Sequence, residues 1–140
     1  MSLLCSAMAN EALNLVLKKC LKIRRPSEAP LPGLKDVDYG MPSSHAQFMG
    51  SILVQVLMLI PGGAWKNILA KVVIIASSIL VCVSRVYLEY HHADQVLVGF
   101  VIGTFFGSIW TFLFHRSTTV AAPKAIKQHL NKLLVMTLAL

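Results

Sequence analysis

Two short stretches of the sequence place imidazole rings beside hydroxyls and positive charges. The first is Ser43-Ser44-His45, and the second runs from Ser84-Arg85 to the pair His91-His92. A third stretch, residues 18–25, is strongly basic. Arg binds phosphate oxygens with two parallel hydrogen bonds and Lys binds them as a point charge, and the free N–H groups at a helix start add to such a site. These residue types favour an anion with several charges, of which phosphate is the obvious one.

The same set is poor in the carboxylates and thiolates that dominate magnesium and zinc sites. The three cysteines form no CxxC pair, so the sequence predicts neither a zinc site nor a disulfide framework; they are Cys5, Cys20 and Cys82. We therefore expect no metal site.

The composition indicates a membrane protein. Of the 140 residues, 56% are hydrophobic and only 14% are charged, with a mean hydropathy of +0.67. A soluble domain is nearer half apolar and a quarter charged, so a soluble globular domain and a disordered chain are both disfavoured. The net charge of +7 would otherwise indicate nucleic acid. With this apolar content we expect basic loops of a membrane protein instead, and no nucleic-acid partner.

Three segments have the length and composition of membrane spans, which need about 20 apolar residues. Residues 46–65 and 96–114 carry no charge, and residues 68–84 carry only Lys71 near one end. Residues 3–17 are a weaker candidate because they contain Glu11 and two Asn. We predict an all-α integral membrane bundle with three clear transmembrane helices and a partial N-terminal helix. Residues 1–116 would form its core and residues 117–140 a basic amphipathic tail.

The order of these spans brings the polar stretches together. A chain that crosses at 46–65 and returns at 68–84 places residues 42–45 and 84–94 on the same side, and residues 18–25 join them. A span count wrong by one would separate the two groups. Lys19, Lys22 and Arg24 are better explained as interface anchors, which are common beside membrane spans.

Three glycines lie four residues apart in the third span, at Gly99, Gly103 and Gly107. Small residues at this spacing let two helices approach closely in lipid, so we expect a helix partner on this face. Glycines that simply face lipid are the alternative, because Gly is common in membrane helices.

The chemistry-bearing residues resemble the three motifs of the type 2 phosphatidic acid phosphatase superfamily, which are K-x6-RP, PSGH and SR-x5-H-x3-D. This chain has Lys18-x6-Arg25-Pro26, then Pro42-Ser43-Ser44-His45, then Ser84-Arg85-x5-His91-x3-Gln95. The Ser in place of the motif Gly and the Gln in place of the final Asp look like the dolichyl diphosphatase branch. The resemblance covers about residues 10–115, and it implies a core related to that of the haloperoxidases.

The resemblance implies a role for each matching residue. His91 would be the nucleophile that forms a phosphohistidine, and His45 would be the general acid. The phosphate-binding residues would be Lys18, Arg25, Ser43, Ser44 and Arg85. The family needs no metal, and no other cofactor is expected.

Two residues could orient His91. Gln95 lies four residues further along, so on a helix it shares a face with His91 and its carbonyl could accept the Nδ1–H. Asp94, three residues along, is the alternative.

The function that the resemblance implies is metal-independent hydrolysis of dolichyl diphosphate to dolichyl phosphate and phosphate. The enzyme would be a multi-pass protein of the endoplasmic reticulum membrane that recycles dolichol for N-glycosylation. A slight excess of Lys and Arg on the opposite side favours an active site facing the lumen. The alternatives are a phosphatase of phosphatidic acid-type lipids and a non-catalytic, truncated membrane protein. The family has about six spans, so we expect upstream helices to be missing, which would expose the glycine face and Gln55 to lipid.

Overall fold

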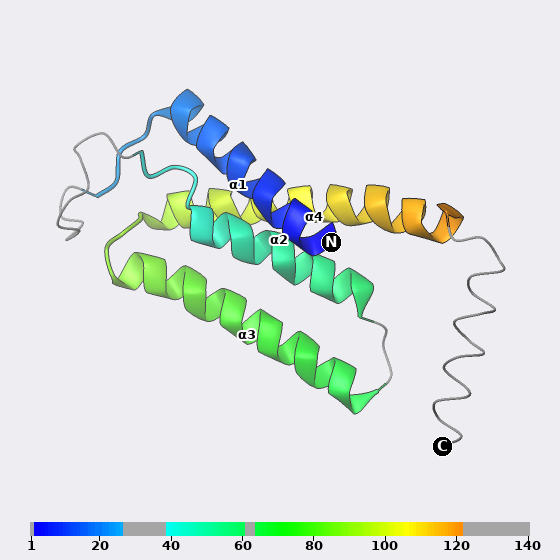
Figure 1. Cartoon of the computed structure of the whole chain (residues 1–140). Coiled ribbons are helices and arrows are strands. Elements are labelled where there is room, and N and C mark those ends of the chain that lie inside the picture. Colours follow the sequence, from blue (N-terminus) through cyan, green and yellow to red (C-terminus); the bar gives the residue numbers. More distant parts are fainter. Residues whose placement is uncertain (1, 27–38, 61–63, 122–140) are drawn as a thin grey trace, which may run out of the picture.

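The structure is a computed structural model that describes residues 2–26, 39–60 and 64–121. These residues form four helices and no strand beyond one isolated bridge, so the all-α prediction is confirmed for the described part. The helices are α1 (Ser2–Leu21), α2 (Ser44–Leu59), α3 (Trp65–Tyr87) and α4 (Ala93–Ala121). Figure 1 shows α2 and α4 side by side, with α1 across them and α3 along the outer side of α2.

The helices alternate in direction along the bundle. As Figure 1 shows, α1 and α3 end where α2 and α4 begin, and we call this the site end. The predicted motif residues all lie in these helix ends or in the adjoining loops. The crossing pattern expected from the sequence therefore gathers the three polar stretches.

The tightest packing in the bundle is between α2 and α4, and glycines make it so. A Cβ at Gly99 would lie 2.6 Å from the carbonyl oxygen of Ser43, and one at Gly107 would lie 2.5 Å from that of Ser51. A Cβ at Gly103 would overlap the carbonyl of Gln47. The predicted glycine seam is thus confirmed, and the helix that packs on it is α2 of the same chain.

Buried polar side chains join α1 to α2. The Asn14 amide donates to Gln47 Oε1 (2.8 Å), and the Gln47 amide donates to Asn10 Oδ1 (3.0 Å). About two turns further along α2, the Gln55 amide donates to Ser6 Oγ (2.9 Å). Because the amide nitrogens of Asn14, Gln47 and Gln55 each find an acceptor, these donors can be buried without a large desolvation cost. The expectation that Gln55 faces lipid is therefore wrong, since only 3% of its surface is exposed.

Two helices in the described part are long and apolar enough to cross a membrane, rather than the three expected. They are Trp65–Tyr87 and the Ala93–Phe114 part of α4. The predicted span 46–65 is wrong in its far end, because α2 stops at Leu59 and Trp65 already belongs to α3. Pro61 follows closely in the sequence and cannot continue a helix. The 16 residues of α2 rise only about 24 Å, less than the apolar thickness of a bilayer.

The boundary predicted at residue 116 falls inside α4, which continues to Ala121. The rest of the predicted amphipathic tail, from residue 122 onward, lies outside the described residues.

Candidate active site

Backbone hydrogen bonds hold the three motif stretches together at the site end. The Gly40 N–H donates to the Ile23 carbonyl (2.7 Å), and a single antiparallel bridge pairs Arg24 with Tyr39. The Ser43 N–H donates to the Gln95 carbonyl (3.1 Å), which ties the start of α2 to the first turn of α4. The loop after α1, the start of α2 and the start of α4 therefore have one fixed arrangement.

His91 is buried, with 3% of its surface exposed, and its ring is oriented by Gln95. His91 Nδ1 lies 3.1 Å from Gln95 Oε1. The Gln95 amide nitrogen donates to the Arg24 carbonyl at 2.8 Å, which fixes which end of the amide faces the ring. Oε1 can only accept a hydrogen bond, so Nδ1 carries the proton. The lone pair of His91 is then on Nε2, the nitrogen that can act as a nucleophile.

Burial keeps this imidazole neutral. It lowers the pKa of His91 to about 4, and the positive charges of Arg25 and Lys18 act in the same direction, whereas the hydrogen bond to Gln95 opposes them. A histidine nucleophile has to be unprotonated to attack. At a pH well above 4, His91 is therefore in the neutral form that such a role requires.

We expect the titration of His91 in the folded protein to have its midpoint near pH 4. The measurement is the pH dependence of histidine side-chain NMR shifts in detergent micelles, with His91 assigned as the signal missing from His91→Gln. Because the unfolded chain protonates this residue near 6.5, acidification below 6.5 favours unfolding. A midpoint close to 6.5 would contradict the burial seen here.

Three of the predicted cations influence the imidazoles: Lys18 and Arg25 act on both, and Arg85 acts on His45. His45 lies in the first turn of α2, ahead of the apolar part of that helix, and is exposed. Burial of part of the ring lowers the pKa of His45, and the positive charge of Arg85 is the next cause, with Lys18 and Arg25 adding to it and Glu11 opposing it. Lys18 and Arg25 act on His45 and His91 alike. These five predicted residues thus share one electrostatic environment.

Arg85 is held at the end of α3 by its neighbours. Its guanidinium lies over the ring of Tyr90, 5.4 Å from the centroid, and its carbonyl accepts from the His91 N–H at 3.2 Å. Stacking on an aromatic ring restrains a guanidinium and leaves its edge available for oxyanions. The turn from α3 to α4 therefore fixes Arg85 and His91 relative to each other.

The start of α2 has hydrogen-bond donors that make no hydrogen bond within the helix. Ser43 is the N-cap residue, but its side chain makes no cap hydrogen bond. Its Oγ is fully buried and has no hydrogen-bond partner among the described residues. Ser44 is the first residue of α2, so its backbone N–H is among those that a helix leaves unpaired. This helix start has the character of an anion-binding site.

A polar pocket of about 630 Å³ opens beside His91. Arg25, Glu89 and His92 line it together with His91, and Val86 and Ala93 form its apolar wall. Among the residues that the structure describes, no three His, Cys, Asp or Glu side chains lie close enough to hold a metal ion.

Comparison with known families agrees with the motif pattern. The family model described as the PAP2 superfamily matches residues 1–119. The chain belongs to the PAP2 superfamily. The catalytic motifs identified in the sequence all lie within the matched residues.

Curated proteins similar to this PAP2 chain carry the name dolichyldiphosphatase. The Saccharomyces cerevisiae protein is 39% identical over 115 residues, which cover 76% of this chain and 48% of that protein. The Dictyostelium discoideum protein is 36% identical over 78% of this chain and 49% of that protein. The human protein is 32% identical over 82% of this chain and 52% of that protein. The chain spans about half the length of these relatives.

A solved structure shares the PAP2 fold. It is the crystal structure of a transmembrane PAP2-type phosphatidylglycerolphosphate phosphatase from Bacillus subtilis, with a TM-score of 0.68 and 24% identity. The match covers 81% of this chain and 58% of that one.

Two residues that the motifs do not contain help to build the PAP2 site. Gly40 lies so close to Gln95 that a Cβ there would be 2.7 Å from Gln95 Oε1 and 2.9 Å from Arg25 Cγ. The Asn14 amide donates to the Pro42 carbonyl (3.2 Å), so it supports the loop before His45. The polar spacing Ser6, Asn10, Asn14, Lys18 at four-residue intervals is a signal that points to this face of α1.

Proposed function

We propose that this chain hydrolyses a polyisoprenyl diphosphate, dolichyl diphosphate, to dolichyl phosphate and inorganic phosphate. The observation that carries the proposal is the His91 ring: it is buried, neutral and oriented by Gln95, at the edge of a pocket lined by Arg25. The names of the relatives support the choice of substrate, since three of them are called dolichyldiphosphatases.

In the first step, His91 Nε2 attacks the terminal phosphorus of the diphosphate. A P–N bond forms, and the bond from that phosphorus to the bridging oxygen breaks, so dolichyl phosphate leaves. His45 gives a proton to the leaving oxygen. General acid help of this kind is worth about 10²- to 10⁴-fold. The negative charge of the bound diphosphate opposes the effect of Arg85 on the pKa of His45 and so favours its protonated form.

In the second step, water attacks the phosphohistidine. His45, which has lost its proton, takes one from the water, the P–N bond breaks, and inorganic phosphate leaves. Both imidazoles then return to their starting protonation states, so the cycle needs no external acid, metal or redox partner.

Lys18, Arg25 and Arg85 would bind the transferring phosphoryl group, with the Ser43 hydroxyl and the Ser44 N–H as further donors. Charges fixed in place before the reaction stabilise the spread negative charge of the transition state. The Ser43 Oγ, which is buried and has no hydrogen-bond partner in the described part of the chain, supports this role, because such a group is costly unless a ligand satisfies it.

We further propose that the chain is a multi-pass protein of the endoplasmic reticulum membrane with its site end facing the lumen. The exposed apolar surface of α3, including Leu80 (70% exposed) and Ile79 (59% exposed), is suited to lipid. A dolichyl tail would stay in the bilayer, and only its head group would have to reach the polar pocket.

Gln95→Leu is expected to lower kcat by about 10- to 100-fold with little change in KM, the size typical of a lost orienting hydrogen bond. Leucine removes both the acceptor for His91 Nδ1–H and the donor to Arg24. Gln95→Glu, which keeps an acceptor, is expected to lose less. The matched control is Asp94→Asn at an exposed position, for which we expect a change of at most about 3-fold. A larger loss in Asp94→Asn than in Gln95→Leu would make Asp94 the orienting residue.

The proposed function is tested by phosphate release from dolichyl diphosphate by the purified chain, with EDTA present. We expect activity with the chelator, and lower activity on phosphatidic acid. Activity that is lost with EDTA and restored by a divalent metal would contradict the histidine mechanism. A higher kcat/KM for phosphatidic acid would replace the proposed substrate by a phospholipid.

A further inference from the structure

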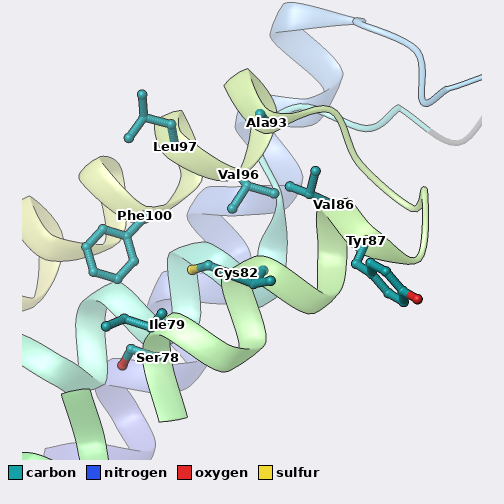
Figure 2. A pocket seen from close by; sticks show the side chains of 10 residues that line it. Ser78, Ile79, Cys82, Val86, Tyr87, Ala93, Val96, Leu97 and Phe100 are labelled. Carbon is teal, nitrogen blue, oxygen red and sulfur yellow. The ribbon is translucent and has the colours of Figure 1, made fainter. Parts of the chain in front are cut away.

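An apolar groove runs along the outside of the bundle between α3 and α4 and is lined almost wholly by carbon. It has a volume of about 640 Å³. Figure 2 shows the side chains that line it, with Ile79, Cys82 and Val86 from α3 and Val96, Leu97 and Phe100 from α4. The groove exists because α3 and α4 make the least contact of the neighbouring helix pairs in the described part.

The groove offers no polar group to a ligand even at its deepest point. Ser78 and Val96 are its most buried residues, at 1% and 6% exposed. The Ser78 hydroxyl donates to the Ile74 carbonyl of its own helix at 2.7 Å, so it is already satisfied. A hydrocarbon can therefore lie against this surface without leaving a buried polar group unpaired.

The groove joins the polar pocket at the site end. Val86 and Ala93 line both the groove and the pocket that contains His91 and Arg25. A molecule with a charged head and an apolar tail could thus place its head against the polar walls of the pocket and its tail against the apolar walls of the groove. The volume is within the range of ligand pockets, about 300–1,000 Å³.

We propose that the groove between α3 and α4 binds the first isoprene units of the lipid substrate and so selects for a polyisoprenyl tail. This inference rests on the proposed function for the identity of the head group. The groove, rather than the histidine site, then provides the preference of the enzyme for an isoprenoid tail. A diphosphate without an isoprene unit would use the same phosphate-binding residues but lack this contact.

The test fills the groove and compares substrates. Cys82→Trp places a large ring at the middle of the α3 wall, and Leu80→Trp places the same ring on the opposite face of α3, where Leu80 is 70% exposed. For each variant, kcat/KM is measured with a long-chain polyprenyl diphosphate and with methyl diphosphate, a short substrate that has no isoprene unit. We expect the long-to-short ratio to fall at least about 10-fold in Cys82→Trp and to stay within about 3-fold of the wild type in Leu80→Trp. A ratio unchanged in Cys82→Trp would overturn the proposal.

A binding measurement separates this proposal from the hydrolytic activity. A polyprenyl phosphate with a diazirine in one of its first isoprene units is photolysed with the full chain in micelles, and the labelled peptides are identified. We expect label within residues 78–100, reduced by excess polyprenyl phosphate but not by phosphatidylcholine. Label elsewhere, or equal competition by phosphatidylcholine, would overturn the groove as a specific site. Wild-type protein that binds the probe there but releases no phosphate would contradict the proposed function alone.

Discussion

In the His91→Gln variant, phosphate release from dolichyl diphosphate is expected to fall by about 10⁴- to 10⁶-fold, the loss typical of removing a nucleophile. Glutamine has no nitrogen lone pair that can attack phosphorus, but its amide can still donate to Gln95 Oε1. A hydrogen bond between the side chain of residue 91 and Gln95 is thus still possible in the variant. The measurement is single-turnover phosphate release, which reports the chemical step separately from product release.

The adjacent His92 provides a matched control for this variant. It lines the same pocket, but it is exposed, whereas His91 is buried. His92→Gln makes the same chemical change one residue away, and we expect a loss of at most about 3-fold. Equal losses in the two variants would show that the site depends on the local fold or charge rather than on His91 as a nucleophile.

Gly103→Leu is expected to have the largest effect on stability, lowering the free energy of unfolding by about 3 kcal/mol, at the upper end for an overpacked core. Any Cβ at residue 103 overlaps the Gln47 carbonyl, and a backbone group cannot rotate away as a side chain can. The helices α2 and α4 would have to separate. Because the bond from Ser43 N–H to the Gln95 carbonyl joins the same two helices, activity is expected to fall with stability.

The stability of Gly103→Leu is measured as the midpoint of SDS-induced unfolding in mixed micelles. The control is Val101→Leu, on the exposed face of the same helix, where an added methylene meets no neighbouring helix (Val101 is 44% exposed). We expect a midpoint close to that of the wild type for Val101→Leu and a clear decrease for Gly103→Leu. A wild-type midpoint for Gly103→Leu would contradict the close approach of α2 and α4.

Several features of the fold follow from local sequence rules. The apolar runs and the order of crossings are sufficient to predict that the motif stretches meet at one end, and the four-residue glycine spacing is sufficient to predict a tight helix contact. The spacing of His91 and Gln95 predicts their shared face, because residues four apart lie together on a helix. The last two predictions rest on spacing within one helix, and the first rests only on the order of the apolar segments.

Other features depend on contacts between distant segments, which hydropathy and residue spacing do not predict. The bond from the Gln95 amide to the Arg24 carbonyl joins positions 71 residues apart. The burial of Gln55 requires Ser6 as a partner, and without that pairing an amide in an apolar run is expected to be exposed. The end of α2 also differs from the prediction, since the sequence remains without a charge as far as Trp65 although α2 ends at Leu59.

A hydropathy pattern does not predict the groove between α3 and α4 either. The positions that line it and those that face outward on α3 are equally apolar, as the pair Cys82 and Leu80 illustrates. Only the divergence of the two helices distinguishes a binding surface from one that faces bulk lipid.

The central claim, that His91 forms a covalent bond to phosphorus, is tested most directly by trapping the intermediate. Dolichyl diphosphate radiolabelled in its terminal phosphate is mixed with the protein and quenched in base, which preserves phosphohistidine, and the labelled peptide is sequenced by mass spectrometry. The account predicts label on His91 in the wild type and its loss in His91→Gln. In His45→Ala the label is expected to form more slowly and, once formed, to be hydrolysed more slowly, because His45 is the acid of the first step and the base of the second. Turnover by the wild type with no label on His91 at any time, or with label on another residue, would contradict it.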